Sequence, residues 1–462
     1  MSLSVLLLLL MVCSTQASDF FSQQQASFFG TFTYYTKEPK VNGSDLLRWR
    51  YTRNSRNCDG SYSSVCPDSS CGYVLSELNK VDSESSGEWC QMEYIYIFPI
   101  LSDDMHQYWL GGDWINGLRN TIRSWNTEVL LELRKRSDTG NENSSPQTTI
   151  IPVVRVPSNC QRDFSLLMFD PDGDDVKCRF GNTSSECDPC NPPSVLSLSP
   201  SCTLSFSPTN SSNEGPYAVQ ILMEDFPRQT ITLNKTTQTI KTTNDAISKA
   251  PLQFVLLVDP AVPSCTGGDF LPRFLPPTPD HRAQLYTNVS QTLQISISAE
   301  AKNSTMSELL FSGPYNVIRN KTGPGEFTLT WTPLQKQAGQ NHPICFVIQA
   351  LSNGTKYHSE LRCLLVGVGI KTTPAATTPT TSLPTTTPKT THSPPANTPA
   401  YVAGLSMKLS SLVDLSHIDR DALLNQIKEA LVKQGLPADI TLQLRSSEPQ
   451  IGATAAPSTD TT

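Results

Sequence analysis

The sequence predicts a mainly β protein, made of tandem disulfide-stapled β-sandwich modules, a disordered Thr/Pro linker and a small C-terminal β-α-β module. Three observations predict this fold class: short apolar segments without a helical period, an even number of cysteines after a leader, and an abrupt change of composition at residue 371. The chain has more Pro (35) than Gly (24), and only 17% of its 462 residues are charged. This balance is typical of extracellular β modules joined by stiff linkers.

Composition and pattern divide the chain into seven parts. We expect a signal peptide (1–17), a Cys/Trp-rich β module (18–156), an immunoglobulin- or cadherin-like sandwich (157–262), a second sandwich (263–370), a mucin-like Thr/Pro linker (371–400), a β-α-β module (401–446) and a disordered tail (447–462).

The first 17 residues have the composition of a signal peptide. Val5 to Val12 is an unbroken apolar run that is too short to span a bilayer, and the small residues Thr15 and Ala17 fit cleavage before Ser18. A core strand or a signal anchor is the alternative interpretation of this run. No later stretch is apolar enough to span, so we expect a secreted, extracellular protein with no membrane span in this chain.

The cysteine count agrees with an oxidising compartment. Cys13 would leave with the signal peptide, and the remaining twelve cysteines are an even number, which indicates a disulfide framework. Cys345 and Cys363 lie on segments expected to pair as neighbours, and Cys160 and Cys265 flank the second module and could clasp its ends. The pairing of the four cysteines between them stays open. The expected disulfide cysteines are Cys58, Cys66, Cys71, Cys90, Cys160, Cys178, Cys187, Cys190, Cys202, Cys265, Cys345 and Cys363.

Asn-X-Ser/Thr acceptors are spread along the chain and stop short of the linker. Together with a signal peptide, this distribution predicts several occupied N-linked glycans on the surface. The acceptors are Asn42, Asn143, Asn182, Asn210, Asn234, Asn288, Asn303, Asn320 and Asn353.

The Cys/Trp-rich module contains several expected strands. In Leu47–Tyr51 the apolar residues fall on one face and the arginines on the other, whereas Tyr94–Ile100 is apolar almost throughout and suits a strand buried on both faces. Val129, Leu131 and Leu133 alternate again. Five of the six tryptophans lie in this module; we expect most of them to be buried anchors, and an aromatic ligand platform is the alternative.

The sequence pattern indicates that the two sandwich modules are diverged copies of one unit. The element Thr-Leu-Ser/Thr-aromatic-Ser/Thr-Pro occurs at 203–208 and again at 328–333, among short strands in the same order. Each unit of about 100 residues has the pattern of an immunoglobulin-like or cadherin-like sandwich. The expected strands are 164–168, 202–208, 217–222 and 253–258 in one copy, and 293–297, 327–333, 343–348 and 361–366 in the other.

The C-terminal parts differ in composition from the modules. Residues 371–400 are mostly Thr, Pro and Ala, which cannot bury enough apolar surface to fold, and their Thr-Thr-Pro units favour O-linked sugars. A plain disordered linker is the alternative. Beyond it, alternation at 405–409 and 440–444 predicts two strands. Between them, a capping box at Ser416 and Asp419 and the apolar positions Leu423, Leu424, Ile427 and Leu431 predict a helix that Gly435 and Pro437 end.

The sharpest local motif is Asp170-Pro-Asp172-Gly-Asp174-Asp175. Four carboxylates within six residues could ligate Ca²⁺, which makes Asp170, Asp172, Asp174 and Asp175 the candidate metal ligands and Ca²⁺ the one candidate cofactor. The glycine stands fourth rather than sixth, so the motif is no EF-hand loop. A tight turn between two strands is the alternative.

The sequence carries no recognisable catalytic motif. G-x-S-x-G, H-E-x-x-H and phosphate-binding glycine loops are all missing, and the six histidines are isolated. We therefore expect no enzyme and assign no catalytic residues. The formal charge of −7 without a basic run argues against nucleic acid as a partner. Extracellular proteins or glycans are the expected partners.

Several motifs taken together resemble those of a known group of proteins: Trp89-Cys-Gln-x-Glu93, Gly112-Asp-Trp-Ile115, Arg155-Val-Pro-x-Asn-Cys160, Phe169-Asp-Pro-Asp-Gly-Asp174 and Trp331-Thr-Pro333. Over the first 370 residues the chain is similar to secreted or surface glycoproteins common in teleost fish, which carry β-sandwich modules followed by mucin-like linkers. The C-terminal unit resembles part of a SEA module, without the Gly-Ser-Val-Val-Val-type strand at which such modules cleave themselves. The resemblance implies no activity that transfers to individual residues.

These observations lead to a functional expectation with alternatives. The first is a secreted extracellular glycoprotein with a structural or binding role in a mucosal or matrix setting, without catalysis. The second is a Ca²⁺-dependent cell-adhesion or receptor ectodomain, as a truncated form of a membrane-anchored protein. A secreted hydrolase is the third, and it would need a deep cleft lined by convergent acids or a Ser/His pair.

Overall fold

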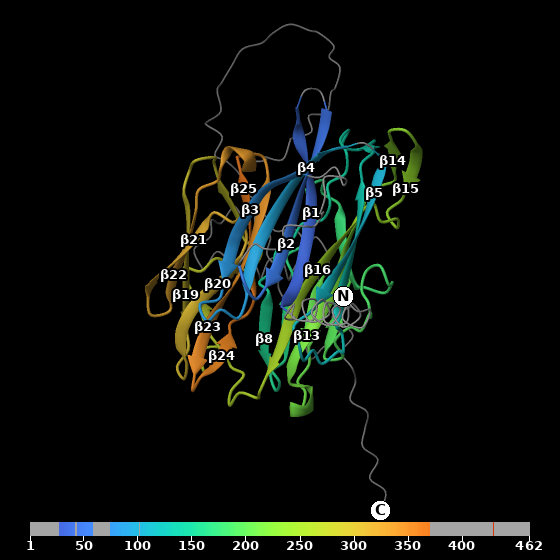
Figure 1. Ribbon diagram of the computed structural model, residues 1–462. Helices are drawn as coiled ribbons and strands as arrows, with labels where there is room; N and C mark the ends of the chain where they lie inside the picture. The colour runs from blue at the N-terminus through green and yellow to red at the C-terminus, as the bar shows by residue number, and fades with distance from the viewer. Residues whose placement is uncertain (1–26, 42–43, 59–73, 101, 370–427, 429–462) are drawn as a thin grey trace, which may run out of the picture. The chain divides into compact units, whose positions relative to one another are not determined.

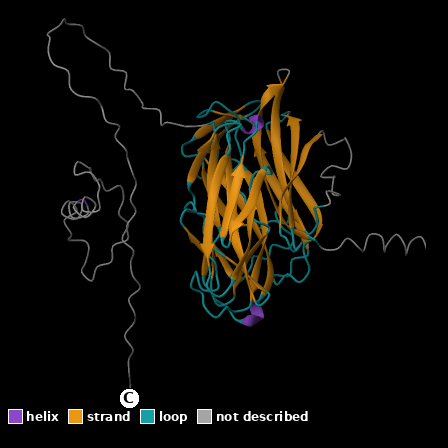
Figure 2. Cartoon of the chain, turned by 90° about the vertical axis from the view of Figure 1, so that its left-hand side faces the viewer, coloured by secondary structure: helices purple, strands orange, loops and turns teal. Residues whose placement is uncertain are grey.

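A computed structural model describes residues 27–41, 44–58, 74–100, 102–369 and 428. The chain divides into two compact units, residues 1–376 and 377–462, and only Lys428 of the second is described, in a helical conformation. The predicted signal peptide, linker, C-terminal module and tail, together with Asn42, Cys66 and Cys71, lie outside the described residues. In the first unit the fold class is the predicted one: strands dominate, and the helical turns are Ser211–Asn213 and Gln335–Gln337 (Figure 2).

The largest sheet of the first unit has ten strands. Seven of them follow in the order β10-β13-β16-β1-β2-β4-β3, β6 and β8 also pair with β16, and β5 pairs with β6 (Figure 1). The bounds are β1 Phe28–Val41, β2 Ser44–Ser55, β3 Val74–Ser83, β4 Cys90–Pro99, β5 Asp104–Asp113, β6 Ser124–Glu132, β8 Val153–Pro157, β10 Asp175–Phe180, β13 Gly215–Phe226 and β16 Lys249–Asp259.

Four smaller sheets complete this unit. Two have three strands: β11 (Leu196–Leu198), β12 (Thr203–Phe206) and β9 (Arg162–Ser165); and β15 (Gln238–Lys241), β14 (Ile231–Asn234) and β7 (Lys135–Arg136). The last two form the third module. One contains β17 (Arg273–Leu275), β19 (Leu293–Glu300), β22 (Glu326–Trp331) and β21 (Val317–Gly323), and the other contains β18 (Gln284–Thr287), β25 (Arg362–Val368), β23 (Asn341–Ser352), β20 (Thr305–Ser312) and β24 (Thr355–His358).

The second module, taken together with β8 from the end of the predicted first module, repeats the strand pairing of the third module. β8 runs parallel to β16, β9 pairs with β12, and β10 and β16 flank β13. In the third module β18 runs parallel to β25, β19 pairs with β22, and β20 and β25 flank β23. The same order of pairing in both copies supports a common structural unit.

The first module does not form a sheet of its own. Phe32 of β1 pairs with Leu252 of β16, and Leu130 of β6 pairs with Lys249, so one sheet continues across the boundary predicted at residues 156 and 157. Composition along the chain cannot reveal this arrangement, because strands pair through space. Where β1 approaches β16, Gly30 has a φ of +116°, and a Cβ atom there would lie 2.2 Å from the Gln253 carbonyl oxygen.

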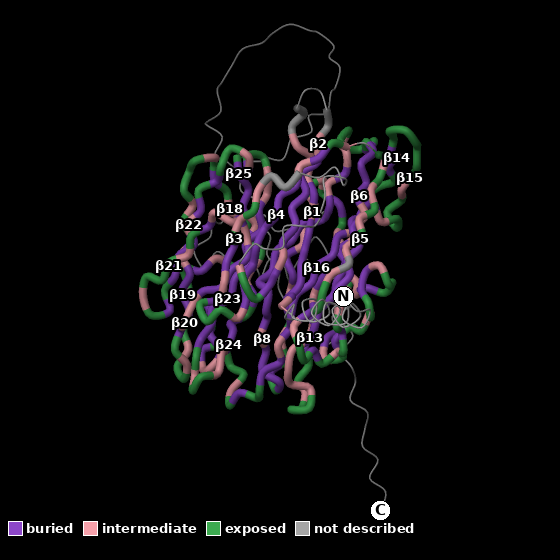
Figure 3. Tube along the Cα trace, viewed as in Figure 1, coloured by how far each residue is buried: buried purple, intermediate pink, exposed green. Residues whose placement is uncertain are grey.

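The tryptophans of the N-terminal region serve as core residues. Trp49, Trp89, Trp114 and Trp125 are at most 4% exposed, and Trp109 is partly buried between Trp49 and Tyr51. Figure 3 shows buried residues along β1, β4, β13 and β16, with exposed residues gathered in the loops. The expectation of structural packing is therefore confirmed for these rings.

Two of the arginines of β2 are buried rather than exposed to solvent. Leu47, Trp49 and Tyr51 enter one core as expected, but Arg48 and Arg50, on the opposite face, are only 5% and 3% exposed. Arg48 pairs with Glu38, and Arg50 pairs with Glu93 at 3.1 Å. Alternation indicates which residues share a face, but it cannot distinguish a face in solvent from one covered by another layer.

Disulfides connect the parts of this unit. The two pairings expected from the sequence are present: Cys160–Cys265 links the ends of the second module, and Cys345–Cys363 joins opposed residues of β23 and β25. The structure also resolves the open set as Cys178–Cys202 and Cys187–Cys190, and Cys58 bonds to Cys90. No helix among the described residues is long and apolar enough to cross a membrane.

Replacing both cysteines of the Cys160–Cys265 bond by alanine is expected to lower the free energy of unfolding more than the same change at Cys187–Cys190. The first bond has a sequence separation of 105 and the second of 3. In the chain-entropy model a loop of roughly 100 residues contributes about 4.7 kcal/mol, and a short ring contributes less. Guanidinium unfolding of the full chain measures the difference, and equal losses would contradict the prediction.

Candidate functional site

The aspartate motif forms a turn that leads into β10. The Asp170 carbonyl oxygen accepts the Gly173 N–H at 3.2 Å, and Gly173 has a φ of +88°, which suits glycine. The Asp170 carboxylate faces back into this turn, where its Oδ1 accepts the N–H groups of Asp172 (2.8 Å) and Asp174 (3.3 Å). Its Oδ2 atom is buried and accepts no hydrogen bond from the described residues.

A third carboxylate reaches the cluster from β13. Oxygen atoms of Asp170, Asp174 and Asp225 lie within 4.8 Å of one another, although Asp225 is about fifty residues further along the chain. Asp225 is fully buried and accepts hydrogen bonds from the Ser248 N–H and hydroxyl, both at 2.7 Å, and from the Asn143 amide at 2.8 Å. We name Asp170, Asp174 and Asp225 the aspartate cluster.

The expected ligands do not all join this cluster. Asp175 points away, pairs with Arg228 at 3.1 Å and is 61% exposed. Asp172 lies at the margin, where it accepts the Ser144 N–H at 2.6 Å. Asp225 was not predicted, because only the pairing of β10 with β13 brings it here. One sequence signal could have indicated it: an ionisable residue that continues the core-facing alternation of Ile221 and Met223.

One guanidinium group faces the cluster. Arg136 of β7 is 2% exposed, and it donates hydrogen bonds to both carboxylate oxygens of Asp174, to both of Asp138 and to the Asn143 side-chain oxygen. Its single positive charge stands among the carboxylates of Asp138, Asp172 and Asp174, with Asp170 and Asp225 beyond. The five carboxylates and the single guanidinium group therefore carry a net negative charge unless the aspartates take up a proton or bind a cation.

The ionisation of the cluster reflects this excess of negative charge. Burial raises the pKa of Asp170 well above its usual range, and the charges of Asp225, Asp172 and Asp174 raise it further. Burial also raises the pKa of Asp225 to about 6, although Asn143 and Ser248 stabilise its ionised form by hydrogen bonding. The cluster can therefore hold a proton near neutral pH or bind a cation in its place.

The donor set suits a hard divalent cation. Ca²⁺ binds oxygen ligands at about 2.3–2.6 Å, so ligands on opposite sides of one ion lie up to roughly 5 Å apart. The oxygens of the aspartate cluster fall within that span, and Asp170 Oδ2 is free to coordinate among the described residues. Arg136 already forms an ion pair with Asp174, so the Asp174 carboxylate would be shared between the guanidinium group and a bound ion.

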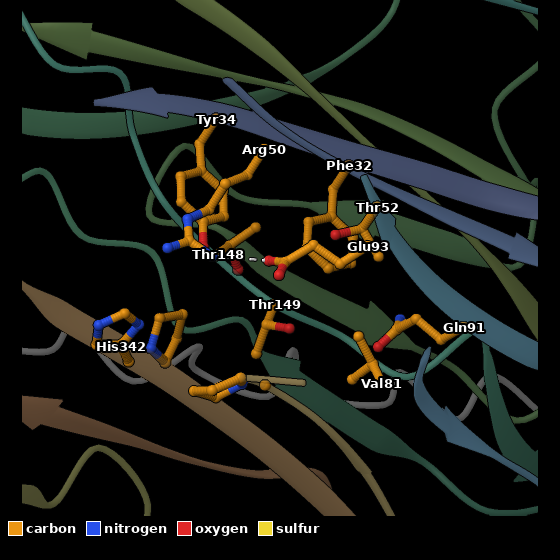
Figure 4. Close-up of a pocket in the computed structure, with 13 residues that line it drawn as sticks. Phe32, Tyr34, Arg50, Thr52, Val81, Gln91, Glu93, Thr148, Thr149 and His342 are labelled. Atoms are coloured by element: carbon orange, nitrogen blue, oxygen red, sulfur yellow. Dashed lines mark hydrogen bonds and ion pairs between the residues drawn. The ribbon is translucent and has the colours of Figure 1, made fainter. Parts of the chain in front are cut away.

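A second polar site lies between the N-terminal strands and the third module. In Figure 4 Arg50 and Glu93 face each other beside Tyr34, and His342 of β23 lies on the opposite side. The cavity volume is about 20 Å³, enough for a single water molecule rather than a substrate. Burial raises the pKa of Tyr34 to about 12 and lowers that of His342 to about 3, with the Arg50 charge adding to the shift at His342.

The predicted glycan acceptors divide into exposed and buried positions. Asn143 is only 3% exposed, and its Nδ2 atom, which would carry the sugar, donates to Asp225 and to the Ser144 carbonyl. The folded chain therefore has no room for a glycan there, and this assignment is corrected. The seven exposed acceptors are Asn182, Asn210, Asn234, Asn288, Asn303, Asn320 and Asn353.

Comparison with known proteins gives limited likeness. No family model matches the sequence. The integrin beta-like protein A of Dictyostelium discoideum is 26% identical over 250 residues, which is 48% of this chain and 11% of that protein. The chain thus spans about a tenth of the length of this relative.

Solved structures with similar parts include immunoglobulin modules and one hydrolase. A pair of tandem immunoglobulin domains of titin covers 48% of this chain and 99% of its own, with 12% identity and a TM-score of 0.16. The Ig1-2 module of the Drosophila receptor protein tyrosine phosphatase DLAR covers 49% of this chain and 100% of its own, with 11% identity and a TM-score of 0.17. An endo-fucoidan hydrolase of glycoside hydrolase family 107 covers 64% of this chain and 39% of its own, with 15% identity and a TM-score of 0.16. At such TM-scores these likenesses carry no argument about the chain.

Replacing Asp170 by Asn is expected to stabilise the cation-free protein at pH 7 and to leave its stability unchanged at pH 4. Because the folded pKa values of Asp170 and Asp225 lie above 3.8, the stability that their retained protons provide is complete below about pH 4. It is lost as the pH rises through the folded values, and the amide side chain of the Asp170→Asn variant would carry no charge at any pH. A gain of about 1 kcal/mol would raise the melting temperature by about 2–4 °C.

Melting curves in chelator from pH 4 to pH 7 measure this effect as the difference between variant and wild type. The matched control is Asp175→Asn, which removes a neighbouring carboxylate outside the cluster and is expected to show no such trend. If the melting temperatures of Asp170→Asn and wild type differ by the same amount at pH 4 and pH 7, the raised pKa of the buried Asp170 carboxylate is refuted.

Proposed function

We propose that this protein is an extracellular glycoprotein whose rigid β body binds other extracellular proteins or glycans and does no catalysis. The observation that carries the proposal is that all ten described cysteines are paired, in five disulfides. Such bonds form and persist in an oxidising compartment, and a cytosolic chain would be kept reduced. Five disulfides restrict large internal motion of the fold, which suits a protein that presents fixed binding surfaces.

The exposed glycan acceptors support the same compartment. Seven of the eight acceptors in the described residues are exposed, as N-glycosylation requires. In this proposal residues 371–400 act as an O-glycosylated spacer between the β body and the C-terminal module, in a mucosal or matrix setting.

A Ca²⁺-dependent adhesion protein or receptor ectodomain is the second candidate. The observation that favours it is the convergence of Asp170, Asp174 and Asp225 around an uncommitted carboxylate oxygen. Loops between extracellular modules often use such oxygens to hold Ca²⁺, which then fixes their geometry. The likeness to a relative named integrin beta-like is in keeping with an adhesion role.

Secretion by eukaryotic cells is expected to yield a protein without free thiols and with several N-linked glycans. Intact-mass measurement before and after glycosidase treatment, with alkylation under denaturing conditions, gives both results at once. Peptide mapping is expected to find Asn143 without sugar in the folded fraction. Recovery of a folded chain with reduced cysteines and no carbohydrate would refute the extracellular proposal.

Ca²⁺ at millimolar concentration is expected to raise the melting temperature of the chelator-treated full chain if the second candidate holds. A ligand present at 100 times its dissociation constant stabilises the folded state by about 2.7 kcal/mol. The increase is expected to vanish in Asp170→Asn and to remain in Asp175→Asn, since only the former removes a cluster ligand. Wild-type protein whose melting temperature and self-association ignore both Ca²⁺ and chelator would eliminate this candidate and leave the first one standing.

A further inference from the structure

Exposed apolar side chains in the two sandwich modules occur beside glycan acceptors. Seven large apolar residues are exposed in the described part of the chain: Leu78, Tyr108, Ile240, Tyr286, Ile318, Leu334 and Leu351. Three of them lie on strands at the end of a sheet and have an acceptor asparagine nearby in the chain or on the neighbouring strand: Ile318, Tyr286 and Ile240.

The geometry is most direct on β21. Ile318 and Asn320 are two residues apart on a regular stretch of this strand, so their side chains point to the same side of the sheet. Ile318 is 60% exposed, and Asn320 is exposed as well. Val317, which precedes Ile318 on β21 and points to the opposite face, is buried. β21 pairs only with β22 among the described strands, so its second edge is unpaired.

Two other end strands carry an exposed apolar residue near an acceptor. Tyr286 of β18 is 52% exposed, and Asn288 is the first residue after this strand, where its carbonyl oxygen accepts the Gln291 N–H at 3.0 Å in a turn. Ile240 of β15 is 63% exposed; the pairing of Asn234 with Gln238 places Asn234 on the same face as Ile240, as its diagonal neighbour. An exposed end strand with apolar side chains is a site for unwanted strand pairing.

We propose that the N-linked glycans at Asn234, Asn288 and Asn320 cover Ile240, Tyr286 and Ile318 and thereby hinder association through these end strands, whose outer edges have no partner among the described strands. The first sugar of a glycan has one face of C–H groups and a rim of hydroxyls. Laid over a neighbouring apolar side chain, it removes that surface from water and turns its hydroxyls outward. This inference rests on the proposed secreted glycoprotein, and it assigns to particular sugars a role in keeping the chain monomeric.

The test compares two ways of removing one glycan in the full chain secreted by eukaryotic cells. Asn320→Gln and Thr322→Ala abolish the same acceptor through different residues, and neither side chain makes a hydrogen bond that the structure records. Both variants are expected to bind more of a hydrophobic dye, to self-associate at lower concentration and to melt about 2–4 °C lower than wild type. The matched control Asn303→Gln removes an exposed acceptor that follows Ala301 instead of a large apolar residue, and it is expected to behave as wild type.

A second substitution separates shielding from a general effect of the sugar on folding. Adding Ile318→Thr to Asn320→Gln is expected to return dye binding and self-association to the wild-type level, because the exposed apolar side chain is then gone. Trimming the glycans of folded wild type to their first sugar is expected to change neither measurement.

Three results would overturn the proposal: an unoccupied Asn320, variants at Asn320 and Thr322 that behave like Asn303→Gln, or a double variant without rescue. Absence of carbohydrate from every acceptor would instead refute the secreted glycoprotein itself. Peptide mapping of site occupancy distinguishes these two failures.

Discussion

The arrangement of the first unit depends on one buried strand that is shared by distant parts of the chain. One edge of β16 pairs with β13 along its whole length, from Lys249 to Val258. Its other edge is divided: Lys249 pairs with β6, Leu252 with β1, and Val255–Asp259 with β8. β16 therefore joins β1 and β6 of the N-terminal region to β8 and β13 in the ten-stranded sheet, so these distant parts of the chain share one sheet instead of forming two domains.

The third module repeats the pairing of the second and joins the rest through a shared apolar core, to which it contributes Leu310 and Val347, and through polar contacts. Asp82 of β3 accepts the Phe311 N–H and pairs with Arg319, both at 3.1 Å, and the Ser312 hydroxyl donates to Gln91 at 2.6 Å. These groups are largely buried, so leaving any of them without its partner would cost the desolvation of a polar group. Directional contacts of this kind fix one docking geometry, which a purely apolar interface would specify less tightly.

Sequence patterns anticipated the elements better than their assembly. The continuous apolar run at Tyr94–Ile100 was recognisable as a buried strand, and the positions of Cys160 and Cys265 at the ends of a module suggested their bond. Local pattern also marked Asp170 and Asp174. It could not supply Asp225 or Arg136, because these residues reach the aspartate cluster only through the pairing of β10 with β13 and of β7 with β14. The burial of Arg50 and Asn143 likewise follows from contacts between layers, and neither residue differs locally from a solvent-exposed one.

The burial of Asn143 has a consequence for biosynthesis. Its amide nitrogen can either carry an oligosaccharide or donate to Asp225, and the second option requires that the segments around residues 136, 174 and 225 have already met. In the secreted glycoprotein proposed above, modification of Asn143 and closure of the chain around it would compete for this one nitrogen atom. A sugar on Asn143 would occupy the space in which its amide group contacts Arg136 and Asp225, so under the proposed function an unmodified Asn143 is a condition for closing this part of the fold.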